Sequence, residues 1–348
     1  MILSFRWYGK DDPIPLRHIR QIPVIKGIVS ALYDVPVGEE WPREKIAALQ
    51  KAVRDEGLEL AVIESIPVHE DIKLGLPTRD RYIDNYRRSI RSMGALGIPI
   101  LCYNFMPVFD WMRSDLSMVL PDGSTALSYD HDAIVSIDLK NGVPDLPGWA
   151  TSYTAEGLRT LFDAYAGIGT EDLWRNLEYF LKAVVPVAEE SGVRMGIHPD
   201  DPPWPIFGLP RIITDDAALD RLVGIVDSPS NGITFCTGSL GPNAGMDLVK
   251  SIGRFTRMGR VPFVHARNIR RMGERGFHET AHCTECGDID MYRIIRELAD
   301  AGFDGVLRPD HGRMIWNEKG RPGYGLYDRA LGAMYLAGLW EGAIGSTK

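Results

Sequence analysis

Short apolar runs rich in β-branched residues recur along the chain, each followed by a polar or Gly/Pro-rich stretch and then by an amphipathic stretch. Eight such runs predict strands, at residues 5–8, 27–32, 59–63, 98–104, 194–198, 232–236, 262–265 and 305–308. The amphipathic stretches predict helices, at about 43–56, 78–96, 171–191, 215–227, 244–256, 288–301 and 324–340, with a weaker one near 15–21. Strands that alternate with helices in eight units predict a closed α/β barrel of the (β/α)8, or TIM, class.

The helix at 171–191 has the strongest signals of its own. Thr170 is a candidate N-cap, and acidic residues follow in the first turn, where they favour the positive end of the helix dipole. Gly192 is a natural residue at which to end the helix. Apolar residues recur at helical spacing in Trp174, Leu177, Leu181, Val184 and Val185.

Residues 105–170 interrupt the alternation of strands and helices, because they separate the fourth predicted strand from its helix by far more than the usual ~2–6 residues. Their Pro, Gly and Asp content predicts an irregular insertion within a single barrel domain that spans residues 1–348. A loop that follows a strand lies on the C-terminal face of a barrel, where these folds carry their chemistry. We therefore expect residues 105–170 to form an active-site lid or a subunit contact.

Composition narrows the class of protein. The chain has 348 residues, which suits a barrel with an insertion, since such barrels typically start near ~250 residues. The net charge of −8 and the absence of a basic run argue against nucleic acid as a partner. No apolar run approaches the ~20 residues of a membrane helix, and the N-terminus does not resemble a signal peptide. Four cysteines are too few for a disulfide framework and favour a reducing cytoplasm.

Four of the predicted strands lead directly into residue types that bind metals. Any one of these residues has an ordinary explanation, such as a hydrogen-bonded histidine, a core cysteine or a helix-capping aspartate. Adjacent strand ends converge on one side of a barrel mouth, however, so the joint pattern predicts a shared metal site. The four residues are His198, Cys236, His265 and Asp310.

The other cysteines give weaker signals. Cys283 and Cys286 form a single CxxC in a predicted loop, whereas zinc ribbons need two such pairs. An ordinary surface loop is the first interpretation, and a local metal clip that uses His282 is the alternative. Cys102 lies within a predicted strand and is expected in the core. Neither a P-loop nor a dinucleotide-binding fingerprint occurs in the sequence.

Several stretches resemble the signature motifs of the mannonate dehydratase family, at residues 5–9, 65–71, 102–107, 198–203, 236–239 and 308–312. The likeness runs from about residue 5 to residue 340. It implies a barrel shaped like xylose isomerase and a Mn²⁺ or Fe²⁺ ion bound by the four residues named above. It also implies dehydration of D-mannonate to 2-keto-3-deoxy-D-gluconate in hexuronate catabolism. The chain departs from the family in a shorter region at 125–170 and in its CxxC loop.

Dehydration of a 2,3-dihydroxy acid requires removal of the C2 proton and protonation of the departing C3 hydroxyl. His311 directly follows Asp310, and Tyr324 lies in the last loop before a helix, so both are expected at the same mouth. His311 could instead orient Asp310, and Tyr324 could serve in packing. Sequence alone does not divide the roles of acid and base between them.

Further residues on the same face are candidates for substrate binding. His69, Glu70 and Asn104 follow earlier strands and are expected to bind hydroxyl groups. His278 is expected in a loop after the seventh strand, from which it would close on the substrate. Two arginines, Arg267 and Arg308, are candidates for the substrate carboxylate, although Arg308 could equally be a structural partner within the barrel.

Two other functions remain open at this stage. An aldose–ketose isomerase or epimerase on the same scaffold would favour oxygen-rich ligands, whereas this set contains a thiolate and two imidazoles. A non-catalytic sugar-acid-binding protein would not require residues that move protons. An assay that compares mannonate with free aldoses as substrates distinguishes the dehydratase from the isomerase or epimerase. Binding without turnover would support the binding protein. We also expect a homo-oligomer, a dimer or larger.

Overall fold

Eight parallel strands close into a barrel in the computed structural model, which describes residues 1–137 and 154–345. The strands adjoin in the closed order β1-β12-β9-β8-β7-β4-β3-β2. They are β1 (Ile2–Arg6), β2 (Gly27–Ser30), β3 (Glu59–Glu64), β4 (Ile100–Tyr103), β7 (Arg194–Ile197), β8 (Asn231–Cys236), β9 (Phe263–Ala266) and β12 (Val306–Pro309). The predicted barrel and its eight strands are therefore confirmed.

The first strand begins and ends earlier than predicted. Its pairing with β12 starts at Ile2, and the strand ends at Arg6, whereas the apolar run predicted 5–8. The Asp12 carboxylate accepts a hydrogen bond from the Tyr8 backbone at 2.7 Å, and Gly9 adopts a φ of 85°. The chain therefore turns away at the aromatic residues, which carry the apolar signal but lie beyond the strand.

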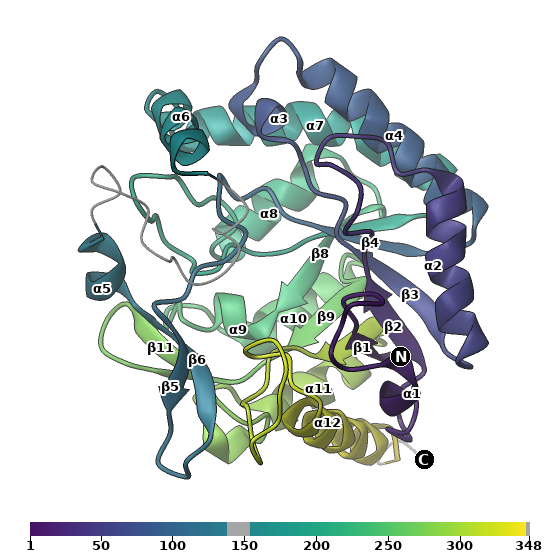
Figure 1. Ribbon diagram of the computed structural model, residues 1–348, viewed down its shortest axis with the longest axis vertical. Coiled ribbons are helices and arrows are strands. Elements are labelled where there is room, and N and C mark those ends of the chain that lie inside the picture. The colour runs from purple at the N-terminus through teal and green to yellow at the C-terminus, as the bar shows by residue number, and fades with distance from the viewer. Residues whose placement is uncertain (138–153, 346–348) are drawn as a thin grey trace.

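Helices surround the barrel, as Figure 1 shows. The predicted helices correspond to α1 (Leu16–Ile19), α2 (Arg43–Asp55), α4 (Arg79–Ala95), α7 (Thr170–Glu190), α8 (Asp216–Ile225), α10 (Leu248–Arg257), α11 (Met291–Asp300) and α12 (Tyr327–Gly345). Two helices that follow strands of the barrel were not predicted, α3 (Glu70–Leu74) and α9 (Thr237–Leu240). Both have at most five residues, too few to show a helical period.

Helix α7 begins one residue before its expected start. Gly169 is the N-cap and Thr170 is the first helical residue, so the predicted Thr170 cap is wrong. The Asp172 carboxylate accepts a hydrogen bond from the Gly169 backbone at 2.9 Å, so the side chain of the third helical residue reaches back to the N-cap amide. Gly192 follows the helix with a φ of 65°, as expected for a residue that ends it.

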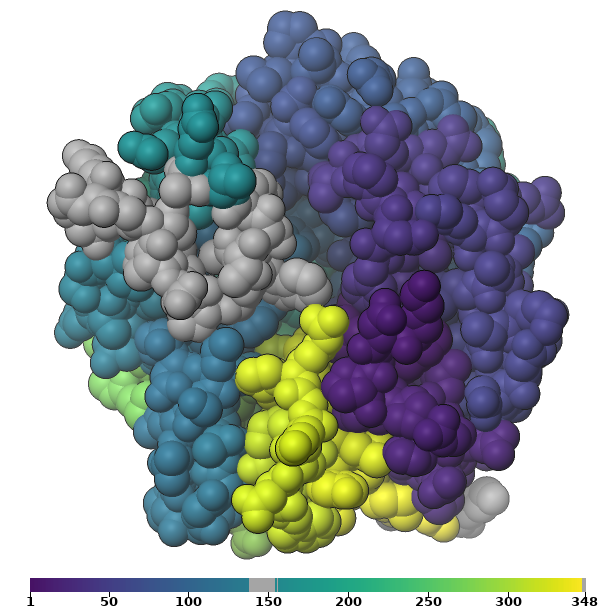
Figure 2. Space-filling model, viewed as in Figure 1, coloured from purple at the N-terminus to yellow at the C-terminus, as the bar shows by residue number. Residues whose placement is uncertain are grey.

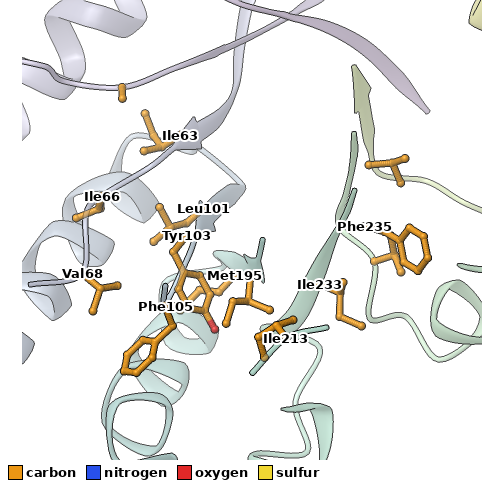
Figure 3. Close-up of a cluster of buried hydrophobic side chains, with 14 of the residues drawn as sticks. Ile63, Ile66, Val68, Leu101, Tyr103, Phe105, Met195, Ile213, Ile233 and Phe235 are labelled. Carbon is orange, nitrogen blue, oxygen red and sulfur yellow. The ribbon is translucent and has the colours of Figure 1, made fainter. Parts of the chain in front are cut away.

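Apolar side chains on alternate positions of the strands pack on opposite faces of the barrel wall. Val62, Ile100 and Phe263 belong to a cluster inside the barrel. Their chain neighbours, such as Ile63 and Leu101, belong to the larger cluster between strands and helices, part of which Figure 3 shows. This period of two therefore determines which strand residues point into the barrel and, at its C-terminal end, into the site.

The helix face of this core supports a first prediction. Leu181 on α7 is 0 % exposed and lies in the cluster between the helices and the barrel. We expect Leu181→Ala to lower the free energy of unfolding by about 2–5 kcal/mol, because it leaves a cavity in a packed core. Urea unfolding followed by circular dichroism measures this loss. An unchanged midpoint would mean that α7 does not pack as described.

The chain between β4 and α7 is irregular only in part: residues 104–114 form no helix or strand, but regular elements follow them, which the sequence did not predict. It forms a hairpin of β5 (Asp115–Val119) and β6 (Thr125–Asp130), followed by α5 (His131–Val135) and, further along, α6 (Ala155–Tyr165). The hairpin joins β10 (Ile269–Arg271) and β11 (Gly276–Glu279) in an antiparallel sheet of order β10-β11-β6-β5 beside the barrel (Figure 1). Residues 138–153 of the predicted insertion lie outside the described residues.

In the part of the chain that the structure describes, none of the helices combines the length and the apolar character that crossing a membrane would need.

Candidate active site at the mouth of the barrel

The side chains of the site lie at the C-terminal ends of the strands, on the side that faces into the barrel. His265 lies two residues after Phe263 on β9, and Arg308 lies two residues after Val306 on β12. Phe263 and Val306 both face inward. Strand register places His265 opposite both Cys236 on β8 and Arg308 on β12. Apolar residues therefore fill the barrel interior, and polar residues take over at the C-terminal ends of the strands.

Three of the predicted metal ligands lie together at this end. His198, Cys236 and His265 each offer a ligand atom within 4.8 Å of the others. Asp310 adjoins them, because its carboxylate oxygens lie 3.7 Å from Cys236 Sγ and 3.9 Å from His265 Nδ1. Cys236, His265 and Asp310 are buried. The structure thus brings all four predicted residues to one place.

The protonation states of these groups suit a cation. His198 Nδ1 lies 2.7 Å from the Pro199 carbonyl oxygen, so it donates its proton there and leaves Nε2 free. Burial lowers the pKa of His198 and favours the neutral ring. Burial also opposes ionisation of Asp310, but the nearby charge of Arg308 holds the pKa of Asp310 well below its usual range. The set therefore offers an imidazole nitrogen and a carboxylate in the forms that bind metals.

A buried nitrogen of the site lacks a hydrogen bond, although a carboxylate lies near it. His265 Nε2 makes no hydrogen bond with any described residue, and Glu64 Oε2 lies 3.4 Å from it. An unpartnered polar atom at this depth costs free energy unless something binds it. Together with the donor types, two imidazoles, one thiolate and one carboxylate, this observation shows that the residues fit a divalent first-row metal.

A second group of potential ligands overlaps the first at His265. It contains Glu64 on β3 and Cys102 on β4, again within 4.8 Å. Glu64 is already paired with Arg308 at 3.0 Å, and burial raises the pKa of Cys102 and so favours its neutral thiol. Since Asp310 adjoins the group that contains Cys236 and adds a fourth ligand to it, we favour that group.

His311 and Tyr324 meet beside this centre. His311 Nε2 lies 2.8 Å from the Tyr324 hydroxyl, and His311 Nδ1 lies 2.8 Å from Glu279 Oε1. Both side chains line the same cavity as His198 and Asp310. Burial raises the pKa of Tyr324, so its hydroxyl stays protonated at neutral pH. The two expected proton carriers are thus in direct contact.

A buried ionic network contacts His311 through Glu279. Arg113, 0 % exposed, donates two hydrogen bonds to the Asp201 carboxylate at 2.7 and 3.0 Å and two to Glu279 Oε1 at 2.8 and 3.2 Å. Arg267 donates to Asp201 at 2.6 Å and to Glu279 at 3.3 Å. Each carboxylate therefore faces two guanidinium groups, an arrangement that offsets the cost of burying charge.

Three of the six predicted substrate-binding residues line the cavity, and three do not. Asn104, Arg267 and Arg308 are among its lining residues. His69 instead caps α3 and stacks on Tyr82 with 3.7 Å between ring centres, outside the cavity. The prediction that it lies with the site is therefore not supported by its position.

Glu70 and His278 also lie apart from the cavity lining. The Glu70 carboxylate accepts hydrogen bonds from Lys73 at 2.7 Å and from the Tyr165 hydroxyl at 2.5 Å. His278 belongs to strand β11, not to a loop as predicted. Alternation along β11 buries Glu279 and leaves His278 only partly buried, so the neighbouring residue is the one that reaches the site.

The sequence interpretation missed several polar residues that line or support the cavity. Arg6, Tyr8 and Glu64 line it, and Asp201 and Glu279 belong to the ionic network. The inward alternation of β1 and β3 would have indicated Arg6 and Glu64, since each lies two residues beyond a strand position that faces inward. Tyr8 packs edge-on against Tyr324 with 5.0 Å between ring centres. Figure 2 shows these N-terminal (purple) and C-terminal (yellow) segments side by side on one face.

The CxxC residues lie away from this centre. Cys283 and Cys286 border a short 3-10 helix, Thr284–Cys286, and neither lines the cavity. Among the described residues, neither group of candidate metal ligands contains His282, Cys283 or Cys286. The surface-loop interpretation agrees with this position. Cys102 is buried, as predicted.

The barrel and the polar cavity at the carboxyl ends of its strands define the class, a (β/α)8-barrel enzyme. The model of the D-mannonate dehydratase (UxuA) family matches residues 1–347. The chain belongs to the D-mannonate dehydratase family and is accordingly a hydro-lyase that acts on mannonate.

Individual relatives agree with this assignment. The chain is 57% identical to mannonate dehydratase 2 of Halalkalibacterium halodurans, over 98% of this chain and 99% of that one. It is 56% identical to the mannonate dehydratase of Streptococcus uberis over the full length of both. The crystal structure of mannonate dehydratase from Streptococcus suis serotype 2 superposes with a TM-score of 0.93 at 51% identity, over 100% of this chain and 96% of that one.

More distant structures share the fold. A xylose isomerase domain protein from Planctomyces limnophilus has a TM-score of 0.56 at 15% identity, and covers 99% of this chain and 98% of its own. The predicted likeness in shape to xylose isomerase is therefore confirmed, at an identity that speaks for the fold alone.

Proposed function

We propose that the chain converts D-mannonate to 2-keto-3-deoxy-D-gluconate and water at the mouth of its barrel. The observation that carries this proposal is the meeting of two sets of residues in one cavity. One set, around Cys236, has the donor types of a metal site, and the other, His311 with Tyr324, has groups that carry protons. A dehydration needs both charge stabilisation and proton transfer.

His198, Cys236, His265 and Asp310 would hold the metal, which we propose is Mn²⁺ or Fe²⁺. A bound dication would supply positive charge that stabilises the negative charge developing next to the substrate carboxylate. A mixed shell of nitrogen, sulfur and oxygen accepts several first-row ions, so the purified protein could carry a different metal from the one that supports turnover.

His311 and Tyr324 would move the protons. One of them removes the C2 proton, and the other protonates the C3 hydroxyl as it leaves. The raised pKa of Tyr324 makes its neutral phenol the more natural donor at rest. Their mutual distance of 2.8 Å allows a proton to pass between them.

Arg308 is the better placed of the two arginines to bind the substrate carboxylate. Its Nη2 contacts Glu64 at 3.0 Å and Asp310 at 2.8 Å, while Nε and Nη1 have no hydrogen-bond partner among the described residues. Both terminal nitrogens of Arg267, in contrast, already serve carboxylates. Asn104 lines the cavity and would bind a hydroxyl.

The experiment that tests this proposal compares substrates. Metal-loaded protein is incubated separately with D-mannonate and with free aldoses and ketoses, and products are identified by NMR. The proposal requires a 2-keto-3-deoxy acid from mannonate and no interconversion of the neutral sugars. Isomerised or epimerised sugars would support the alternative enzyme class, and tight binding without product would support a binding protein.

We further propose that the enzyme works in the cytoplasm as a homo-oligomer, in the catabolism of hexuronates. A thiolate ligand such as Cys236 is best preserved in a reducing compartment. Large apolar side chains are exposed near and along α12, including Trp316 at 72%, Leu331 at 51% and Met334 at 46%, and a second copy of the chain would cover them. The role of residues 105–170 as a lid or subunit contact stays a prediction.

A further inference from the structure

Glu279 is a buried carboxylate for which the chemistry above gives no role. It ends β11, and its side chain is 0 % exposed. Its Oε1 atom accepts hydrogen bonds from Arg113 Nη2 at 2.8 Å and from Arg267 Nη1 at 3.3 Å. The same atom lies 2.8 Å from His311 Nδ1. Glu279 therefore connects the ionic network to the histidine that contacts Tyr324.

The short contact with Glu279 decides where the His311 proton resides. A carboxylate oxygen has no proton to give, so at 2.8 Å the ring nitrogen must be the donor. Arg267 Nη1 also lies 3.0 Å from this Nδ1, but it has carboxylate acceptors in Glu279 Oε1 and in Asp310 Oδ2 at 3.4 Å. The proton therefore belongs on Nδ1.

The state of Glu279 supports this assignment. Burial alone would favour its neutral acid, but the hydrogen bond from His311 and the charges of Arg267 and Arg113 hold the pKa of Glu279 below its usual range. The carboxylate is thus an ionised acceptor. A histidine held by an ionised acceptor at one nitrogen presents a defined lone pair at the other.

We propose that Glu279 is a positioning residue, which holds His311 in the tautomer protonated on Nδ1 so that Nε2 accepts the hydroxyl proton of Tyr324. The hydrogen-bonded series then runs from Tyr324 through His311 to Glu279, with 2.8 Å at both contacts. The Tyr324 hydroxyl is thereby held in a defined orientation within the cavity that it lines. This inference rests on the proposed function in one respect, namely that His311 and Tyr324 act on the substrate.

The tautomer itself can be measured without substrate. Protein labelled with [15N]histidine and loaded with Zn²⁺, a diamagnetic ion, is examined by 15N–1H correlation NMR. His311→Gln identifies the signals of His311 among the eight histidines. The proposal requires a protonated Nδ1 and a bare Nε2 in His311, and a bare Nδ1 would overturn it. This result does not depend on whether the protein dehydrates mannonate.

Kinetics of Glu279→Gln tests the consequence. We expect kcat for mannonate to fall on the order of 10²-fold, as for the loss of a group that supports acid–base transfer, while KM changes less than about threefold. Metal content measured on the same sample should equal that of the parent. A kcat within about threefold of the parent at equal metal content would overturn the proposal.

Asp328→Asn is the matched control, because Asp328 is another buried carboxylate, paired with Arg313 at 2.8 Å, that neither touches His311 nor lines the cavity. Each variant changes the carboxylate of a buried ion pair to an amide, so both should lower Tm. Only Glu279→Gln should lower kcat by two orders of magnitude. An equal loss of kcat in Asp328→Asn would reduce Glu279 to a structural role and overturn the inference. If Glu279→Gln does not fold, the tautomer of His311 measured in the parent protein still tests the proposal.

Discussion

Replacing Cys236 with serine is expected to remove most of the bound metal and nearly all turnover. Cys236 Sγ lies among His198, His265 and Asp310, so this substitution exchanges a thiolate for a neutral hydroxyl at the centre of the set. Loss of a residue that merely supports a ligand costs ~10–100-fold in metal affinity or activity, and loss of a ligand itself should exceed that. Elemental analysis and kcat on the same samples measure both effects.

Cys102→Ser identifies which of the two ligand groups operates. Both cysteines are buried on neighbouring parts of the barrel wall, and the change from sulfur to oxygen is the same. The account requires Cys236→Ser to lose metal and Cys102→Ser to retain it. The reverse outcome would move the metal to the group of Glu64, Cys102 and His265. His265→Ala should lose metal in either case.

The second large effect concerns the proton carriers. We expect His311→Asn and Tyr324→Phe each to lower kcat by ~10²–10⁴-fold while metal stays bound, because a general acid or base contributes that much. Tyr324→Phe removes only the hydroxyl that lies 2.8 Å from His311. Steady-state kinetics with metal analysis on the same preparations separates loss of chemistry from loss of metal.

Tyr33→Phe provides a control for removing a phenol near the same mouth. Tyr33 accepts a hydrogen bond from Arg6 at 3.1 Å but is 45% exposed. The kcat of Tyr33→Phe should stay within a few-fold of the kcat of the parent. Near-parent kcat at full metal occupancy in His311→Asn or Tyr324→Phe would remove that residue from the chemistry. Metal loss in His311→Asn would instead indicate that His311 orients Asp310.

Sequence alone indicated the barrel because each strand is short, apolar and bounded by turn residues. It also indicated His198, Cys236, His265 and Asp310, because strand ends of a closed barrel must converge. The sheet of β5, β6, β10 and β11 could not be predicted in the same way. Its middle strands, β6 and β11, pair across about 150 residues of chain, with Phe277 opposite Tyr129, and no local pattern records such a partner.

The same limit explains why three of the predicted substrate-binding residues lie outside the cavity lining. His278 and Glu279 are adjacent in the sequence, and only the pairing of β11 decides which one faces His311. His69 follows a strand, as predicted, but it caps α3 and stacks on Tyr82 instead of entering the cavity. Residues that directly follow the apolar strand runs were therefore predictable, whereas the positions of His69 and His278 depended on tertiary structure.

Restoring metal to chelated protein tests the central claim most directly. Mn²⁺ or Fe²⁺ is titrated into metal-free protein, and bound metal, consumption of D-mannonate and formation of 2-keto-3-deoxy-D-gluconate are measured together. The account predicts that activity rises in proportion to bound metal and saturates at one ion per chain, with one molecule of product for each mannonate consumed. Full activity in metal-free protein, or consumption of mannonate without loss of water, would contradict it.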